Sequence, residues 1–288
     1  MEGGSLAGRR HGYIGLFSPH HSCFDCGEDN CLMESNICLI LEYDGTAYHG
    51  WQRQKNSLGI QQVLEKALSE VYQEQIVVTG AGRTDSGVHA LGQCCNFRAH
   101  TQVPVDRVAL VLNHQLPSDI RVKSAEQVSD SFHARYSAHS KRYCYLLEQR
   151  ANANAFNYRY SWPVNDELDI VAMKNGAAYL TGRHDFRNFT VSGVSATDFV
   201  RNVQELNINP LLSADSIFPW QCMNQPILIE VEANGFLYKM VRIIVSRLVA
   251  VGRGRILPAD MGGYLDGSFN RRIPPAPPQG LFLKEVSY

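Results

Sequence analysis

A glycine-rich stretch, GAGRTDSGVH at residues 80–89, is the part of the chain whose composition most strongly indicates chemistry. It presents one carboxylate, Asp85, with Arg83 two residues before it and His89 four residues after it. The glycines fit neither the dinucleotide-binding fingerprint nor the phosphate-binding loop that ends in Gly-Lys-Ser/Thr. Glycine lets a substrate approach the backbone closely, so we expect a loop at a strand end that exposes a reactive acid. The alternative is an Asx turn in an ordinary surface loop.

A second feature is a run of cations without acids between residues 233 and 259. Its five basic residues are Lys239, Arg242, Arg247, Arg253 and Arg255. The net charge of the chain is only −1, yet 20 of its 27 basic residues are arginine. Guanidinium groups suit bidentate phosphate contacts and stacking on bases. We therefore predict a basic stripe that binds nucleic acid, with a solvated helix face as the alternative.

The first 34 residues differ from the rest because they are rich in Gly, His and Cys and show no apolar periodicity. We expect a disordered extension there. Its Cys23-x-x-Cys26 pair is followed by Cys31 but by no second pair at a zinc-site distance, so we predict no metal.

The eight cysteines have no disulfide spacing, no secretory signal is recognisable and no apolar run could span a membrane. A reduced, cytoplasmic protein is expected.

Seven blocks occur in order between residues 36 and 288, each with several uncommon polar or aromatic identities. Together they resemble the TruA family of tRNA pseudouridine synthases. The blocks are YDGTAYHGWQRQ (43–54), GRTDSGVHALGQ (82–93), FHARYSAHSKRYCY (132–145), GRHDFRNF (182–189), NGFLYKMVRIIV (234–245), VGRG (251–254) and APPQGLFL (276–283).

The resemblance implies an enzyme that isomerises uridine to pseudouridine in the anticodon stem-loop of tRNA, at positions 38, 39 and 40. That reaction breaks the N1–C1′ bond, turns the uracil, rejoins it through C5 and releases the C5 proton. No group is imported and no oxidation state changes, so no cofactor or metal is expected. The resemblance also implies a homodimer whose subunits build the RNA cleft jointly.

The family resemblance assigns roles to individual residues. Asp85 matches the nucleophile, Arg83 an arginine that contacts the extruded nucleotide, and Tyr143 a tyrosine that stacks on the uracil and relays the C5 proton. Arg242 matches the arginine that pairs with the nucleophile and keeps it ionised and aimed. The predicted substrate-binding set also contains four cleft residues: Tyr143, Lys239, Arg253 and Arg255.

Elements that position these residues follow from apolar periodicity. We expect an α+β protein with the pseudouridine synthase fold, in which two similar halves with mostly antiparallel sheets flank an active-site cleft. The halves span residues 35–137, which carry Asp85, and residues 138–288. Expected strands cover 37–43, 76–80, 93–99, 120–128, 142–147, 203–208, 227–232 and a terminal strand within 281–286, and expected helices cover 60–72, 104–112, 166–180 and 237–251.

Two other functions compete with this interpretation. A catalytically silent RNA-binding module on the same scaffold would not need Asp85, Tyr143 and Arg242 together. A nucleoside hydrolase that uses Asp85 as a glycosidase carboxylate would need a partner acid, and no second acid stands in a recognisable motif. The isomerase therefore explains more of the residues than either alternative.

Overall fold

The computed structural model describes residues 34–100, 103–149, 155–191, 197–211 and 226–288. All of them belong to one compact unit, Met33–Tyr288. The predicted N-terminal extension and its cysteine pattern lie outside the described residues, apart from Glu34 at the start of the first strand.

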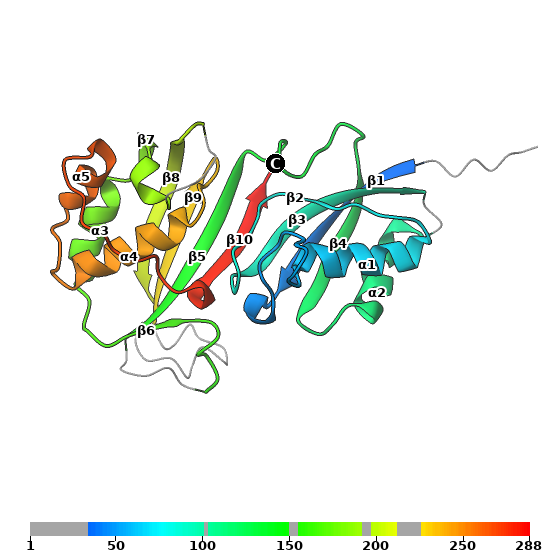
Figure 1. Cartoon of the computed structure of the whole chain (residues 1–288), viewed down its shortest axis with the longest axis horizontal. Coiled ribbons are helices and arrows are strands. Elements are labelled where there is room, and N and C mark those ends of the chain that lie inside the picture. Colours follow the sequence, from blue (N-terminus) through cyan, green and yellow to red (C-terminus); the bar gives the residue numbers. More distant parts are fainter. Residues whose placement is uncertain (1–33, 101–102, 150–154, 192–196, 212–225) are drawn as a thin grey trace, which may run out of the picture. The chain divides into compact units, whose positions relative to one another are not determined.

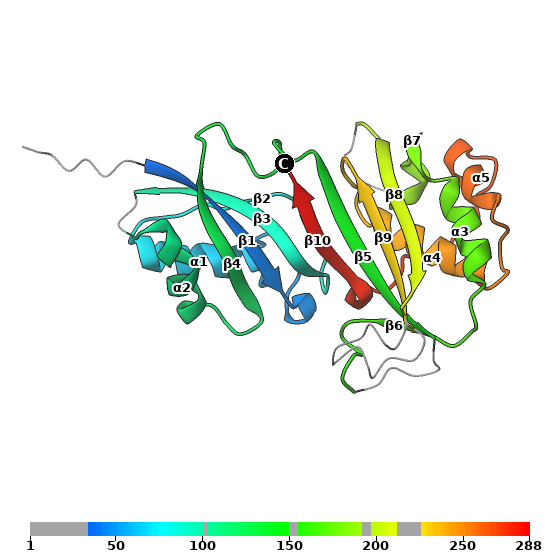
Figure 2. The same cartoon turned by 180° about the vertical axis from the view of Figure 1, so that it is seen from behind.

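Within the described residues, ten strands form a single sheet that runs through both predicted halves (Figures 1 and 2). The strand order is β4-β1-β3-β10-β5-β9-β8-β7, with β2 paired to β3 and β6 paired to β5. The strands are β1 Glu34–Tyr43, β2 Thr79–Gly80, β3 His89–His100, β4 Ile120–Val128, β5 Ser140–Gln149, β6 Trp162–Val164, β7 Gly182–Asp185, β8 Val200–Pro210, β9 Pro226–Ala233 and β10 Leu281–Ser287. Pairing is antiparallel except for β10 with β3 and β5 with β6. The α+β class and the mostly antiparallel pairing are confirmed.

The C-terminal strand β10 joins the two halves. Leu283 on β10 lies opposite Ala90 of β3 on one side and opposite Tyr143 of β5 on the other. Neighbouring strands are about 4.8 Å apart, so the start of β3 and the middle of β5 lie about 10 Å apart across β10. The predicted terminal strand is confirmed, and it holds the strand that leaves the Asp85 loop beside the strand that carries Tyr143.

The helices cover one face of the sheet, which is toward the viewer in Figure 1 and behind the strands in Figure 2. Alternation along β1 explains this arrangement, because Ile37, Leu39 and Leu41 are completely buried on the covered face. The helices are α1 Ile60–Tyr72, α2 Val105–Gln115, α3 Ile170–Ala178, α4 Met240–Gly252 and α5 Asp260–Asp266.

Three predicted elements are shorter than expected, for identifiable reasons. Side chains replace the sheet partners of the predicted strand 76–80: Glu65 accepts from the Val78 amide and Gln61 donates to the Val78 carbonyl. Only Thr79 and Gly80 pair with β3. Helix α3 begins after Asp169, whose carboxylate accepts from the backbone amide three residues on, as an N-cap does. Helix α4 begins three residues late because Lys239 has a left-handed backbone, with φ of 59°.

Candidate active site

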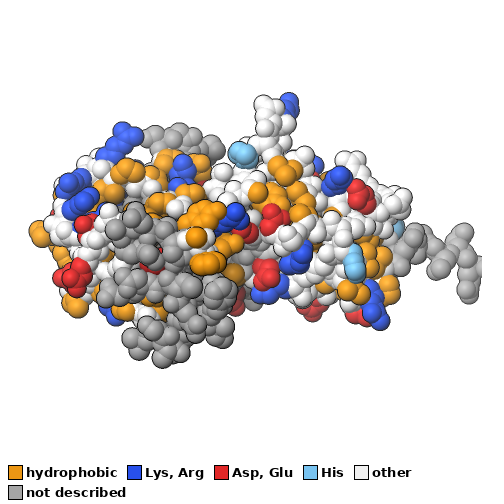
Figure 3. All heavy atoms as spheres, turned by 90° about the horizontal axis from the view of Figure 1, so that it is seen from below, with side chains coloured by type: hydrophobic (Ala, Val, Ile, Leu, Met, Phe, Trp, Pro, Cys, Tyr) orange, Lys and Arg blue, Asp and Glu red, His pale blue; other side chains and the backbone are white. Residues whose placement is uncertain are grey.

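A cleft of about 1010 Å³ opens where the Asp85 loop, β5 and the start of α4 meet. Among the described residues that line it, six are Lys or Arg and only one is acidic, Asp85. The cations are Arg83, Arg135, Lys141, Arg201, Lys239 and Arg242. By contrast, basic and acidic side chains are interspersed over the described part of the face shown in Figure 3. Positive charge is therefore concentrated in this cleft although the net charge of the chain is −1.

Asp85 and Arg242 form an ion pair in the cleft although they lie 157 residues apart in the sequence. Arg242 Nη1 donates to Asp85 Oδ2 at 3.1 Å, and the two side chains are 12% and 16% exposed, respectively. Arg242 Nε donates to the Ala276 carbonyl at 2.7 Å, and the Ala276 amide donates back to the Arg242 carbonyl. The guanidinium is thus fixed at both ends and holds the carboxylate in one orientation.

A buried hydrogen-bond network supports the Asp85 loop from below. The Tyr43 hydroxyl lies 2.9 Å from the hydroxyl of Thr84, the residue before Asp85. Gln93 Nε2 donates to the Gly82 carbonyl at 2.8 Å, and the Trp51 amide donates to the Thr84 carbonyl. Gly82 and Thr84 of the loop are therefore bonded to β1, to β3 and to the segment after β1. This network explains why the 43–54 block is needed: it supports the loop.

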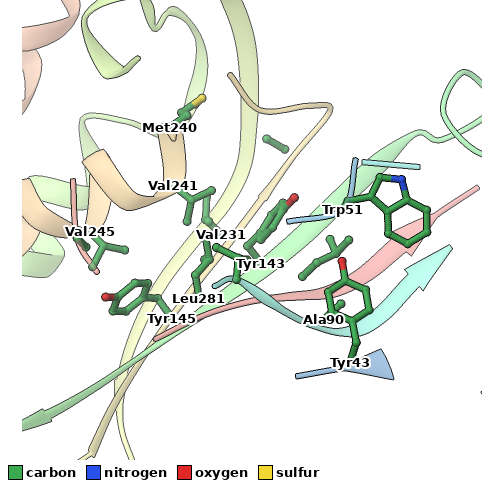
Figure 4. Packing of buried hydrophobic residues seen from close by; sticks show 14 of the residues in the cluster. Tyr43, Trp51, Ala90, Tyr143, Tyr145, Val231, Met240, Val241, Val245 and Leu281 are labelled. Atoms are coloured by element: carbon green, nitrogen blue, oxygen red, sulfur yellow. The ribbon is translucent and has the colours of Figure 1, made fainter. Parts of the chain in front are cut away.

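Tyr143 projects from β5 into the cleft and is only 7% exposed (Figure 4). Its ring packs edge-on against Phe236, with centroids 5.0 Å apart. Its hydroxyl lies 3.8 Å from the point where a side chain at Gly82 would begin, so it faces the glycine-rich loop. Burial raises the pKa of Tyr143 well above its usual value, and the nearby Tyr43 and Asp85 raise it further. The phenol is therefore protonated in the unliganded protein.

Lys141 is a cleft residue that the sequence analysis did not select. It stands two residues before Tyr143 on β5, so both side chains leave the strand on the same face. The Lys141 side chain also lies 3.8 Å from the Gly82 Cβ position. Burial lowers the pKa of Lys141, and the charge of Arg135 lowers it further. Strand alternation from Tyr143 was the signal that would have identified Lys141.

Arg83 and Lys239, both predicted to bind substrate, line the same cleft. Arg83 is exposed and makes no ion pair with any other described residue. The Lys239 amine lies 5.0 Å from the centroid of the exposed Tyr238 ring. The structure therefore brings Asp85, Tyr143, Arg242, Arg83 and Lys239 together.

The remaining cations of the predicted basic stripe lie elsewhere. Arg247 is buried, with its guanidinium 3.5 Å from the Tyr264 ring centroid and 4.3 Å from that of Phe189. Arg253 forms an ion pair with Asp166 at 2.5 Å. Arg255 is exposed beside a separate hollow of about 430 Å³. The idea of one continuous stripe is therefore wrong: α4 is buried on nearly all sides, and of the five cations only Lys239 and Arg242 line the cleft.

His89, at the end of the glycine-rich stretch, does not line the cleft. The Gly45 amide donates to its Nδ1 at 3.0 Å, and its Nε2 lies 2.8 Å from the Arg159 carbonyl. Its ring stacks on Phe282 of β10 with centroids 4.8 Å apart. His89 therefore connects the end of the loop to β10.

Two further observations concern the part of the chain that the structure describes. No three His, Cys, Asp or Glu side chains gather there as metal ligands would. No described helix combines the length and the apolar character needed to cross a membrane.

Known proteins are similar to this chain over most of its length. A family model described as tRNA pseudouridine synthase matches residues 39–137 and 177–288. A protein of Thermoanaerobacter sp. (strain X514) named tRNA pseudouridine synthase A is 44% identical over 255 residues, which are 88% of this chain and 99% of that protein. Proteins with the same name from Ruminiclostridium cellulolyticum and Acetivibrio thermocellus are each 40% identical, again over 88% of this chain and 99% of theirs.

Among solved structures, an archaeal box H/ACA Nop10–Cbf5 complex overlaps 79% of this chain and 47% of that chain. The TM-score is 0.34 at 10% identity, which is too low to support an argument. The family match and the relatives carry the conclusion instead. Because they span most of the sequence, the chain belongs to the tRNA pseudouridine synthase family, whose members are isomerases that convert uridine to pseudouridine.

Proposed function

We propose that this chain isomerises uridine in the anticodon stem-loop of tRNA, at positions 38, 39 and 40, with Asp85 as the nucleophile. The observation that carries the proposal is the Asp85–Arg242 ion pair. Among the described residues, Asp85 is the single acid that lines a cleft with six cations, and such a cleft attracts a polyanion. The relatives named tRNA pseudouridine synthase A support tRNA as the substrate. The anticodon stem-loop comes from the family resemblance.

Each residue has a part in the bond changes. The Asp85 carboxylate attacks an electron-poor carbon, C1′ of the ribose or C6 of the uracil, or assists departure of the base through a glycal. The N1–C1′ bond breaks, the uracil turns, and C5 bonds to C1′. Any bond that Asp85 formed to C1′ or C6 then breaks, or the C2′ proton that it removed on the glycal route returns, so the carboxylate is restored. The C5 proton leaves and N1 gains a proton, so the base keeps its composition. Arg242 holds the carboxylate still while this happens.

Tyr143 is suited to the base itself. Its ring forms a wall of the cleft within the same space as Asp85, so a uracil there would stack on an aromatic face. The Tyr143 hydroxyl is the proposed relay for the C5 proton. Exposed Arg83, two residues before Asp85, would hold the extruded nucleotide by its phosphate.

The other cations serve the RNA backbone in this proposal. Lys239 binds phosphate at the cleft, whereas Arg253 and Arg255 would contact a part of the RNA beyond it, because neither lines the cleft. We also propose that two copies of the chain share the RNA. The dimer rests on the family resemblance alone, and sedimentation of the protein with and without tRNA tests it.

Replacement of the nucleophile tests the function directly. Asp85→Asn should abolish tritium release from a tRNA transcript labelled at uridine C5, while its affinity for tRNA stays close to wild type. One carboxylate contributes little to an interface dominated by phosphate contacts. Asp185→Asn is the matched control, because Asp185 also pairs with an arginine, Arg187, but does not line the cleft.

Two results would contradict the proposal. If Asp85→Asn kept a tenth of the wild-type rate, Asp85 would not be the nucleophile. If the wild-type protein bound tRNA and released no tritium, the RNA-binding module would be the better description.

A further inference from the structure

The rim of the cleft carries an aromatic side chain that the proposed chemistry does not use. Tyr136 lies in the segment between β4 and β5 and lines the cleft together with His133 and Arg135. It is 76% exposed, the largest fraction among the big apolar and aromatic side chains of the described residues. An aromatic ring that is exposed beside a basic cleft is available to stack on a bound base.

The ring of His133 is fixed in place by the local backbone. Its Nδ1 accepts from the Arg135 amide at 3.1 Å and from the Tyr136 amide at 3.2 Å. The His133 amide and the Ser137 amide make further bonds that close the turn, to the Ser137 hydroxyl and to the His133 carbonyl, respectively. The Tyr136 ring lies against this fixed histidine, with centroids 4.3 Å apart and planes at 33°. The aromatic pair is therefore ordered before any ligand arrives, which lowers the entropic cost of binding.

Arg135 lies beside the aromatic pair and Lys141 lines the same cleft, and neither cation has an acidic partner among the described residues. The Arg135 guanidinium is 5.5 Å from the Tyr136 ring centroid. Arg135 is also close enough to Lys141 for its charge to lower the pKa of that amine. Both side chains line the cleft, and an anion bound between them would relieve the repulsion of their like charges. A ligand with a planar ring and an adjacent phosphate would satisfy the aromatic pair and both cations.

We propose that Tyr136, backed by His133, is a stacking platform for an unpaired nucleobase of the bound RNA, whose phosphate is held between Arg135 and Lys141. The base is a second one, distinct from the uridine that reacts at Asp85. This inference rests on the proposed RNA substrate. Stacking on an exposed aromatic ring beside guanidinium groups is a common way in which proteins hold single-stranded RNA.

The chain contains a natural comparison for this platform. Tyr158 is also an exposed tyrosine, at 49%, and the Arg159 guanidinium lies 5.4 Å from its ring centroid. Arg159 Nε donates to the Tyr158 hydroxyl, and neither residue lines the cleft. Tyr158 therefore reproduces the exposed ring and its arginine outside the proposed site.

Three variants of the full-length protein test the platform: Tyr136→Ala, Tyr136→Phe and Tyr158→Ala. Affinity for a fluorescent, unmodified tRNA transcript is measured by anisotropy over a range of salt. Loss of one stacked base should weaken binding by Tyr136→Ala about five- to a hundredfold. Tyr136→Phe keeps the ring and Tyr158→Ala leaves the cleft intact, so both should bind within about twofold of wild type. The salt slope should stay unchanged in all three, because no charge is removed.

Several outcomes would overturn the platform. Wild-type affinity in Tyr136→Ala would do so, as would equal losses in Tyr136→Phe and Tyr136→Ala, since the hydroxyl would then be the essential group. If Tyr136→Ala changed the sedimenting mass of the free protein, the ring would be a contact between two copies and not an RNA site.

Tritium release at saturating tRNA separates this inference from the proposed function. We expect Tyr136→Ala to keep its turnover when saturated, because the platform binds and does not react. If wild type itself released no tritium, the proposed function would fail, while the binding comparison would still decide whether a base stacks on Tyr136.

Discussion

Both ends of helix α4 carry basic residues, but the two ends have different surroundings. At its N-terminal end, Lys239 and Arg242 line the cleft with Asp85. At its C-terminal end, Arg253 pairs with Asp166, and Arg255 borders a separate hollow. The helix is 13 residues long, so about 18 Å separates these ends. Residue type therefore does not predict which of these cations belongs to the site. Its position relative to Asp85 does.

The middle of α4 shows a third outcome. Arg247 follows Arg242 by five residues, which turns it to a different side of the helix. There it lies among Tyr264, Phe189 and the carbonyl of Asn188, which accepts from its Nη2 at 2.8 Å. No acid among the described residues pairs with it. Arg247 is therefore a buried packing residue, held by aromatic faces.

The largest effect should come from Arg242. Arg242→Gln removes the charge beside Asp85 and one of the two bonds that fix this side chain, so we expect turnover at saturating tRNA to fall about 10²- to 10³-fold. Single-turnover tritium release measures the loss, and circular dichroism shows whether the fold survives. A folded Arg242→Gln protein with wild-type turnover would mean that the two ends of α4 do not differ in catalysis.

A smaller effect, on stability, is expected at Arg247. Arg247→Ala loses contacts with two aromatic rings and leaves a cavity, partly offset by removal of a buried charge, so the free energy of unfolding should fall by about 1–3 kcal/mol. Arg247→Met fills more of the space and should lose less. Urea unfolding measures both. Turnover of the folded variants should remain within about twofold of wild type, and a catalytic loss at unchanged stability would place Arg247 in the site.

The smallest effect is expected at the far end of the helix. Each phosphate contact adds about 0.7 to 0.9 to the slope of log affinity against log salt. Because Arg253 is already paired with Asp166, the double variant Arg253→Gln/Arg255→Gln should flatten the slope by about one contact. The matched cleft variant Arg135→Gln/Lys141→Gln should flatten it by about two. Equal slopes in the two double variants would remove the distinction between cleft and helix end.

Sequence reasoning was most successful where a local rule applies. Alternating apolar residues located β1, and periodic ones located α1, whose observed span agrees with the predicted 60–72. It was less successful where a side chain competes with the backbone. Glu65 and Gln61 of α1 bond to the backbone of Val78, which reduces the predicted strand 76–80 to two residues. Apolar periodicity does not predict hydrogen bonds from helix side chains to a neighbouring backbone.

The sequence likewise indicates some residues of the proposed site and not others. Glycine spacing around Asp85 and the ordered blocks indicate the loop, Tyr143 and Arg242 from the sequence alone. Lys141, Arg135 and Tyr136 lie within the 132–145 block but were missed because the resemblance assigned them no role, and only Lys141 follows from strand alternation with Tyr143. Their importance comes from the cleft that they line.

The sequence by itself determined the class of fold and the family and indicated Asp85 as the candidate nucleophile, because propensity, periodicity and motif order are carried by neighbouring residues. The family resemblance implied that Arg242 pairs with Asp85, but only the tertiary structure showed that contact and decided which other residues share the cleft. Arg242 pairs across 157 residues, and Leu283 brings Ala90 and Tyr143 to either side of one strand. These contacts form only when long loops close and the strands pair in the correct register. The burial of the whole sheet and its helices selects that arrangement.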